Sequence, residues 1–391
     1  MMQEALANTP ERQAVRDAVR AICDRYDDDY WGELDRTHTF PHEFCRDIAA
    51  GGWLGIAMPA EYGGSGLGVT EASIMMQVVG ASAGYFAACS AIHINIFGLH
   101  SIVKHGSDAQ KREWLPKVIS GEIRACFGVT EPDAGLDTTR IKTRAVRRGD
   151  HYVVHGQKIW TSTAQQAHKI VLLARTTPLE ECARPTEGLT LFFADKDPRT
   201  VKVTEIPKMG RHAVNSNQVF YDGLEIPVEH RIGEEGQGFR YILDSLNPER
   251  ILNAAEVLGM GRRALDKAAR YAAERVVFGR PIGKNQAIAH PLAEAWAELY
   301  AAELMMLHAS ELYDSGKPCG AEANAAKLLA ADAGFKACDR AIRTHGGMGY
   351  AAEYHVERYF REMVACQLAP VSREMILNFL SERQLGLPKS Y

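Results

Sequence analysis

The chain has 391 residues, a charged fraction of 24% and a formal net charge of −4 at pH 7. A chain of this length exceeds one ordinary hydrophobic core, so two or three domains are expected. The charge balance and the lack of a dense basic cluster argue against nucleic acid as a partner. The eight cysteines are scattered without metal-ligand spacing, so we expect reduced thiols, no metal site and a cytoplasmic protein.

The first predicted domain covers residues 1–124 and is helical. Asn8-Thr9-Pro10-Glu11 is typical of a helix start, and the polar N-terminus does not resemble a signal or transit peptide. The stretch between Glu71 and Lys104 contains no Asp, Glu, Lys or Arg and is long enough to cross a bilayer. Polar residues and glycines interrupt this stretch, so we predict a pair of buried helices and no membrane span.

The second predicted domain covers residues 125–235 and is all β. An apolar strand is expected from Ala125 to Val129, and Gly149-Asp150 between two extended runs predicts a hairpin. Further short strands are expected in the segments KIVLLART, LTLFFAD and VKVTEI, which Pro, Gly and Asp residues separate.

Two polar ends of strands in this domain are candidates for a cofactor platform. Pro132 ends the first strand because proline cannot donate to a strand ladder. The hydroxyls of Thr130, Thr161 and Ser162 are then free to bind a flat polar molecule, and Trp160 could cover one face of its ring. The alternative is an ordinary loop between two strands.

The third predicted domain covers residues 236–391 and is helical again. One stripe of small and apolar residues at helical spacing consists of Ile251, Ala255, Leu258, Leu265, Ala269 and Ala272. Three more helical blocks are expected around 284–315, 321–345 and 355–384. Four long helices predict a bundle.

Two segments of this third domain suit ligand binding. In RVVFGRPIGKNQ (275–286) a helix ends and the chain turns, with Arg275 and Gln286 on either side of the turn. Arg275 suits a pyrophosphate because its planar fork offers paired N–H donors, although a cation at a helix C-terminus also complements the helix dipole. In RTHGGMGYA (343–351) two adjacent glycines indicate that another molecule approaches the backbone closely. This segment is not a dinucleotide-fold GxGxxG, because no βαβ unit surrounds it.

Four segments in this order and spacing resemble the acyl-CoA dehydrogenase family, namely TEPDAG-LD, KIWTST, R-x-x-FGRPI-x-x-x-Q and HGG-x-GY. The resemblance covers essentially the whole chain. It implies a mainly α fold with an N-terminal helical domain, a small middle β-domain (barrel or sandwich) and a C-terminal four-helix bundle. It also implies FAD in a cleft that a neighbouring subunit of a homotetramer or dimer completes.

The resemblance assigns flavin contacts residue by residue. The implied contacts before residue 163 would line the flavin ring or form hydrogen bonds near its N5 atom. The implied contacts from Arg275 onward would reach the FAD of an adjacent subunit or hold the adenine end of FAD. Two positions depart from the family pattern, because Leu136 stands where a Ser is usual and Arg343 where a Gln is common. The implied contacts are Phe127, Val129, Thr130, Leu136, Trp160, Thr161, Ser162, Arg275, Phe278, Gln286, Arg343, Gly346 and Gly347.

The family's reaction needs a carboxylate that removes the proton next to the thioester. In many members this base lies in a Y-E-G-T run, but here the corresponding stretch is QLAPVSRE and Pro370 occupies the position. A minority, including the isovaleryl- and long-chain enzymes, carries the base before an Arg on the first bundle helix. The matching residues are Asn247-Pro248-Glu249-Arg250, so we expect Glu249 to be the base, in the first turn of a helix. The alternative is an acid that only complements the helix dipole.

Substrate contacts are expected from Asn247, Arg250 and Ala369. Arg250 would hold CoA or orient Glu249, and the small Ala369 stands where many straight-chain enzymes have Tyr, which leaves room for a branched or bulky acyl group. Pro370 lacks the N–H that polarises the thioester oxygen in the family. The replacement donor would be the Val371 N–H or a ribityl hydroxyl of the flavin.

The predicted function is thus FAD-dependent conversion of an acyl-CoA to the trans-2-enoyl-CoA, with an electron-transfer flavoprotein as electron acceptor. Two alternatives stay open. One is a non-catalytic or partner-dependent subunit that binds flavin or CoA without turnover, and the other is a flavin oxidase or monooxygenase that acts on a substrate without CoA.

Overall fold

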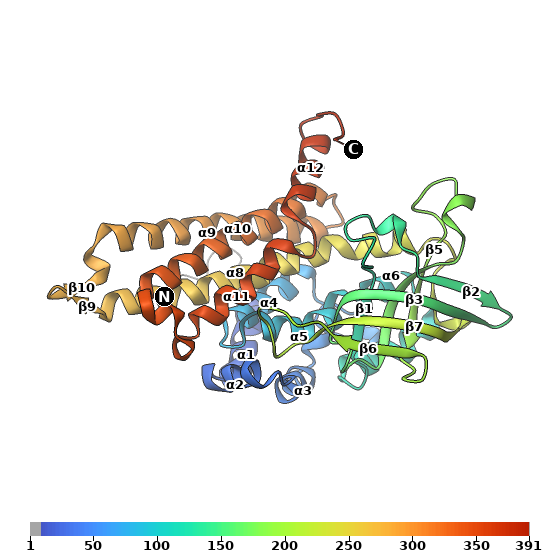
Figure 1. The fold of residues 1–391 in the computed structure, drawn as a ribbon, viewed down its shortest axis with the longest axis horizontal. Helices are drawn as coiled ribbons and strands as arrows, with labels where there is room; N and C mark the ends of the chain where they lie inside the picture. Colours follow the sequence, from blue (N-terminus) through green and yellow to red (C-terminus); the bar gives the residue numbers. More distant parts are fainter. Residues whose placement is uncertain (1–8, 391) are drawn as a thin grey trace.

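The computed structural model describes residues 9–390, with helices at both ends of the chain and a β-sheet between them (Figure 1). The predictions that concern the extreme N-terminus, including the Asn8 part of the helix start, fall on residues 1–8 and lie outside the described residues. The fold class expected from the sequence is confirmed: the chain is mainly helical with a central β-sheet region.

Helices pack together in the N-terminal part as predicted. Thr9 caps the first helix by accepting from the backbone N–H of Arg12, and Pro10 occupies its first position. The elements are α1 (Pro10–Cys23), α2 (Asp28–Thr37), α3 (His42–Ala50), η1 (Trp53–Gly55), η2 (Ala60–Tyr62), α4 (Val69–Ala81), α5 (Tyr85–Phe97), α6 (His100–His105) and α7 (Asp108–Ile119).

The long apolar stretch forms α4, α5 and the short α6, one helix more than the predicted pair. Counted as one element, Tyr85–His105 is long and apolar enough to cross a membrane, but 78% of its apolar 18-residue window is buried inside the protein. Helix α5 packs against α4, α8 and α11. These contacts identify it as a core helix of the fold.

The central region is an eight-stranded sheet with the order β6-β7-β3-β2-β4-β5-β8, and β1 pairs with β4 in parallel. The predicted hairpin is present, because β2 and β3 pair antiparallel and Arg148 lies opposite His151 across the turn. Strand β7 was not predicted, since polar residues and Gly223 interrupt its alternation. The strands are β1 (Ala125–Gly128), β2 (Arg144–Arg148), β3 (His151–Ser162), β4 (Lys169–Arg175), β5 (Leu189–Asp195), β6 (Val201–Glu205), β7 (Ser216–Pro227) and β8 (Arg231–Ile232). Three short turns of helix, η3 (Thr138–Arg140), η4 (Leu179–Glu181) and η5 (Val228–His230), connect them.

Five helices follow, and the last predicted block is two helices that break at residues 369–372. The longest, α8, begins at Gly238, so the predicted helix start at Asn247-Pro248 is wrong. Proline inside a helix costs one backbone hydrogen bond. Burial of Tyr241 and Ile242 near its start stabilises the helix, so it continues past Pro248. The elements are α8 (Gly238–Glu274), β9 (Val276–Val277), β10 (Arg280–Pro281), η6 (Ile282–Lys284), α9 (Gln286–Asp314), α10 (Gly320–His345), η7 (Gly346–Tyr350), η8 (Ala352–Tyr354), α11 (Val356–Leu368) and α12 (Arg373–Arg383).

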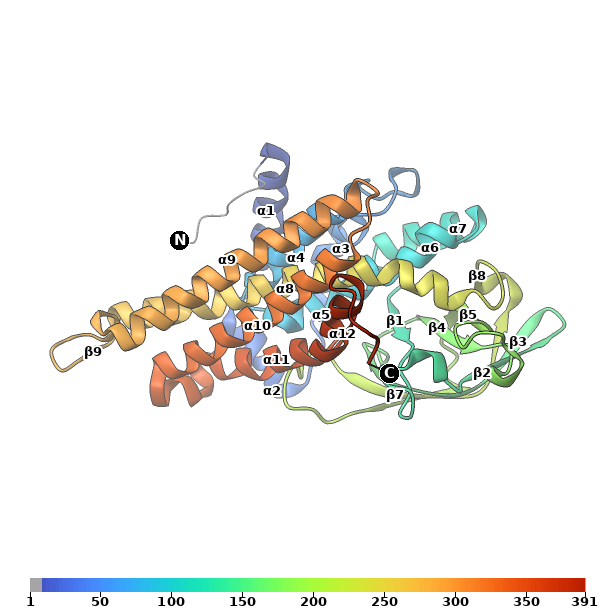
Figure 2. The ribbon, with the colours of Figure 1, turned by 90° about the horizontal axis from the view of Figure 1, so that it is seen from above.

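The predicted stripe on α8 is buried except for Ala269, which is exposed, while its neighbour Ala268 faces the core. Seen from above, α8, α9, α10 and α11 run side by side away from the sheet (Figure 2). The domain boundaries at 124/125 and 235/236 stay a prediction.

Helices α4 and α8 cross at a pair of glycines. A Cβ added at Gly259 would lie 2.1 Å from the carbonyl oxygen of Gln77, and one added at Gly80 would lie 2.4 Å from that of Glu256. We therefore expect Gly259→Ala to lower the free energy of unfolding by about 1–3 kcal/mol, because the helices must move apart. Thermal unfolding tests this, with Gly320→Ala as the control, since its Cβ would make only an ordinary contact with Phe379.

Candidate functional site

A buried ion pair fixes the turn after β1 onto β3. Lys158 Nζ donates to Glu131 Oε1 at 2.8 Å and to the carbonyl oxygen of Val129 at 2.9 Å. The Glu131 carboxylate also accepts from the backbone N–H groups of Lys142 and Thr143, at 2.6 and 2.9 Å. Desolvation lowers the pKa of Lys158 to about 8. The turn is therefore held rigidly beside the end of β3.

The end of β3 carries the exposed ring of Trp160 next to the hydroxyl-bearing residues Thr161 and Ser162. Trp160 has a φ of +61° in an irregular stretch of the β3–β7 pairing, and 55% of the residue is exposed. The Ile159 N–H donates to the carbonyl oxygen of Thr130 at 2.9 Å, which places the two predicted segments side by side. Thr161 Oγ1 is buried and has no hydrogen-bond partner among residues 9–390. An exposed ring beside an unpartnered hydroxyl fits a flat, polar group such as a flavin ring.

The two remaining contacts predicted on β1 and its turn differ in position. Phe127 is partly buried on β1, which contacts β3, whereas Leu136 is 56% exposed in the turn. Leu136 offers no hydrogen bond from its side chain, so this position can contribute only apolar contact.

Arg211, which the sequence analysis missed, connects the sheet to the N-terminal helices. Its guanidinium donates to Ser90 Oγ on α5 at 2.9 Å, to Ser162 Oγ at 3.1 Å and to Ser216 Oγ at 2.7 Å. Because Arg211 only donates, the oxygen of Ser162 accepts and its own proton stays available for another acceptor. This is the orientation that a bond from Ser162 to a ring nitrogen requires.

Glu249 lies about three turns inside α8, so the expectation of a first-turn acid is wrong and the helix-dipole alternative does not apply. Its side chain is only partly covered, yet desolvation by the surrounding protein raises the pKa of its carboxyl to about 7. The charges of His93 and Arg250 oppose this shift, and that of Glu256 adds to it. His93 lies one turn beyond Ser90 on α5. Glu249 and the end of β3 therefore face the same stretch of α5.

The predicted substrate contacts group near Glu249. Arg250 donates to Asn247 Oδ1 at 3.2 Å. The exposed Ala369 ends α11 in the segment that precedes α12. Lys327 on α10 donates to the carbonyl oxygen of Val371 at 2.9 Å and anchors this segment. Desolvation lowers the pKa of Lys327, and Arg250 is among the charges that act on it, so the segment and Arg250 occupy one region.

The other predicted flavin contacts lie at the opposite end of the bundle. The β9–β10 hairpin projects beyond the helices, away from the sheet (Figure 1), and Phe278 at its tip is fully exposed. Stacking of Tyr271 on His345, with ring centroids 4.3 Å apart, joins the ends of α8 and α10. This end carries Arg275, Phe278 and Gln286 together with Arg343, Gly346 and Gly347. One chain thus does not bring these residues to Trp160.

Arg343, one of the implied flavin contacts, is paired with Asp339 on the surface of α10. Its Nε donates to Asp339 Oδ2 at 2.8 Å, one helical turn away, and this bond raises its pKa. The pair is exposed, so solvent screens it and the guanidinium keeps N–H donors for a second acceptor.

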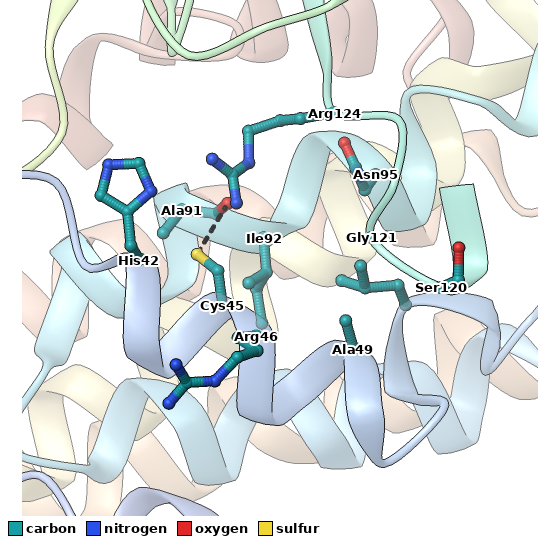
Figure 3. Close-up of a pocket in the computed structure, with 11 residues that line it drawn as sticks. His42, Cys45, Arg46, Ala49, Ala91, Ile92, Asn95, Ser120, Gly121 and Arg124 are labelled. Atoms are coloured by element: carbon teal, nitrogen blue, oxygen red, sulfur yellow. Dashed lines mark hydrogen bonds between the residues drawn. The ribbon is translucent and has the colours of Figure 1, made fainter. Parts of the chain in front are cut away.

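A small pocket of about 150 Å³ lies elsewhere, between α3, α5 and the segment before β1 (Figure 3). It is smaller than the usual range for a cofactor or substrate site, roughly 300–1,000 Å³. Asn95 on its wall is fully engaged, since its amide donates to the carbonyl oxygen of Ile123 and accepts from the N–H of Ala125. None of the predicted site residues lines it, so we assign it to packing.

Comparison with protein-family models gives three matches that follow one another along the chain. They are the acyl-CoA dehydrogenase N-terminal domain over residues 9–122, the middle domain over 126–224 and the C-terminal domain over 236–385. Acyl-CoA dehydrogenase FadE12 of Mycobacterium tuberculosis is 36% identical over 393 residues, which cover 100% of each chain.

Two solved structures share the fold. The structure of a glutaryl-coenzyme A dehydrogenase glutaryl-CoA complex aligns with a TM-score of 0.92 at 30% identity, covering 99% of this chain and 98% of that one. Butyryl-CoA dehydrogenase from Megasphaera elsdenii aligns with a TM-score of 0.91 at 26% identity, covering 97% and 100%.

Proposed function

The chain belongs to the acyl-CoA dehydrogenase family of FAD-dependent oxidoreductases, and from this we propose that it converts an acyl-CoA to the trans-2-enoyl-CoA with Glu249 as the base. The carboxylate of Glu249 takes the proton from the carbon next to the thioester. Bound FAD supplies the acceptor for the hydride that leaves the adjacent carbon. The electrons then pass to an electron-transfer flavoprotein.

The observation that carries this proposal is the environment of Glu249. A general base works best when its pKa lies near the working pH, because it is then ionised and still basic. Desolvation raises the pKa of the Glu249 carboxyl to about 7, far above the ordinary value for glutamate. Arg250 beside it keeps part of the population ionised.

We further propose that Phe127, Val129, Thr130, Trp160, Thr161 and Ser162 hold the ring of FAD. The unpartnered Thr161 hydroxyl and the oriented Ser162 hydroxyl support this assignment. The Val371 N–H is the chain's own candidate for polarising the thioester oxygen, since Pro370 has no N–H. The small Ala369 leaves space for a branched acyl group.

The acidity of Glu249 predicts a pH dependence. A protonated carboxyl cannot accept the α-proton, so the rate of flavin reduction should fall about tenfold per pH unit below the pKa near 7 and level off above it. Stopped-flow reduction from about pH 5.5 to about pH 8.5 measures this. A rate that is flat through neutral pH would show that Glu249 does not titrate in the reaction.

The exposed hairpin predicts a role between subunits. We propose that Arg275, Phe278 and Gln286 of one subunit, with Arg343 to Gly347, reach the FAD of another copy in a homo-oligomer. Phe278→Ser should then lower the FAD content of purified protein by more than half and weaken the oligomer. An aromatic side chain that becomes buried between subunits contributes roughly 2–4 kcal/mol to their association. Flavin absorbance and light scattering test this. Leu385→Ser, at an exposed residue near the C-terminus, is the matched control.

Anaerobic mixing of the purified flavoprotein with straight and branched acyl-CoAs tests the proposed function. Bleaching of the flavin, with formation of a product two hydrogens lighter, supports dehydrogenation and names the acyl class. A bound flavin that no thioester bleaches would instead favour a partner-dependent subunit, or an enzyme that acts on a substrate without CoA.

A further inference from the structure

Polar side chains continue along α8 beyond Glu249, on the face that packs against α5. Asn253 and Glu256 follow Glu249 at four and seven residues, which places all three on one side of the helix. Asn253 is 8% exposed and Glu256 is 1% exposed. His93 approaches from α5. A site that binds only a hydrocarbon chain would not require these buried polar side chains.

Hydrogen bonds within the cluster fix the direction of each group. The Glu256 carboxylate accepts from His93 Nδ1 at 3.1 Å and from Asn253 Nδ2 at 3.5 Å. Since a carboxylate only accepts, the amide nitrogen of Asn253 must face Glu256 and its oxygen must point away. That oxygen, Oδ1, is buried and has no hydrogen-bond partner in the described part of the chain.

His93 leaves a second group for a ligand. Its Nδ1 is bonded to Glu256, so Nε2 is the nitrogen left for another partner. The side chain is 16% exposed, and its charge acts on the carboxyl of Glu249. Nε2 of His93 and Oδ1 of Asn253 thus remain for a ligand next to the proposed base.

We propose that His93 and Asn253 form a subsite for a hydroxyl group on the acyl chain, so that the enzyme acts on a hydroxylated acyl-CoA. A hydroxyl donates its proton to Asn253 Oδ1. Its oxygen accepts from Nε2–H of His93 in the imidazolium form, whose charge acts on Glu249. A carboxylate on the chain fits less well, because the carboxyls of Glu249 and Glu256 would repel it. The inference rests on the proposed function, which places the α-carbon at Glu249.

The spacing along α8 sets the position of the hydroxyl. Asn253 lies about 6 Å further along the helix axis than Glu249, at 1.5 Å per residue. A hydroxyl on the δ or ε carbon of the acyl chain spans a similar length. These are the positions at which we expect the group to bind.

Stopped-flow reduction of the FAD-loaded enzyme by matched thioesters tests the proposal. The pairs are straight-chain acyl-CoAs with and without one hydroxyl at the δ or ε carbon. For the wild-type enzyme we expect the hydroxylated thioester to be favoured at least about tenfold in reduction rate over Kd, since the unsubstituted chain leaves Asn253 Oδ1 unpaired. In Asn253→Leu the ratio should fall to about one or below.

Equal reduction by both thioesters, with no change of the ratio in Asn253→Leu, would overturn the subsite while leaving dehydrogenation intact. Flavin that no thioester reduces would overturn the proposed function and the subsite with it. Should Asn253→Leu not fold, the wild-type ratio decides together with His93→Gln, which keeps a donor for Glu256 and should also lower the ratio. The ratio compares two substrates on one protein preparation, so a loss of active protein does not change it.

Discussion

Glu249→Gln should lower the rate of flavin reduction by an acyl-CoA by about two to four orders of magnitude, the usual contribution of a positioned general base. Glutamine has the same shape and is neutral, so it fills the same space but cannot accept a proton. Anaerobic stopped-flow measurement at about pH 8, where the wild-type carboxyl is mostly ionised, gives the full effect.

The protein itself should remain intact in this variant. Desolvation makes the ionised carboxyl of Glu249 costly, so a neutral amide should leave the free energy of unfolding unchanged or raise it slightly. The FAD content should equal that of the wild-type protein. Glu274→Gln, at the exposed end of the same helix, is the matched control and should retain the wild-type rate. Wild-type reduction by Glu249→Gln would mean that another group removes the proton.

Lys158→Met should lower the free energy of unfolding by about 3–5 kcal/mol, the largest stability effect that we expect in the sheet. The substitution leaves the Glu131 carboxylate buried with backbone donors but no cation. Because this pair holds the turn beside the end of β3, the variant should also retain less FAD. Urea unfolding followed by circular dichroism measures the stability, and flavin absorbance measures the cofactor.

The double variant Lys158→Met/Glu131→Gln separates the pair from its surroundings. It removes both charges, so it should recover part of the stability that Lys158→Met loses. A loss below about 1 kcal/mol in Lys158→Met would show that the buried carboxylate is stabilised by its backbone donors alone.

The order of helical and β segments could be predicted from the sequence because each segment carries its own periodicity. Strands β2, β3 and β6 alternate, whereas β4 and β5 are continuous apolar runs. Turn residues separate all five, and the expected hairpin has the predicted turn. The start of α8 could not be predicted, since Pro248 is a local signal that tertiary burial of Tyr241 and Ile242 overrides. Strand β7 could not be predicted for a similar reason. Its local alternation is weak, and pairing with β3 and β6 on either side stabilises it as a strand.

The site residues that lie in local sequence motifs could be predicted. The site residues that only tertiary packing brings together could not. Trp160 and Thr130 were expected together and lie in neighbouring segments. Arg211 has no local signal, since its three hydroxyl partners come from α5, β3 and β7. The bond from His93 to Glu256 joins residues 163 positions apart, so it appears only in the folded chain.

The most direct test of Glu249 is hydrogen exchange at the α-carbon. The FAD-loaded enzyme is incubated in D2O with an acyl-CoA whose β-methylene is replaced by sulfur, which blocks hydride transfer but leaves the α-proton acidic. Mass spectrometry should show deuterium at the α-carbon with the wild-type enzyme and none above background with Glu249→Gln. Exchange at the wild-type rate by the variant would contradict the assignment of Glu249 as the base.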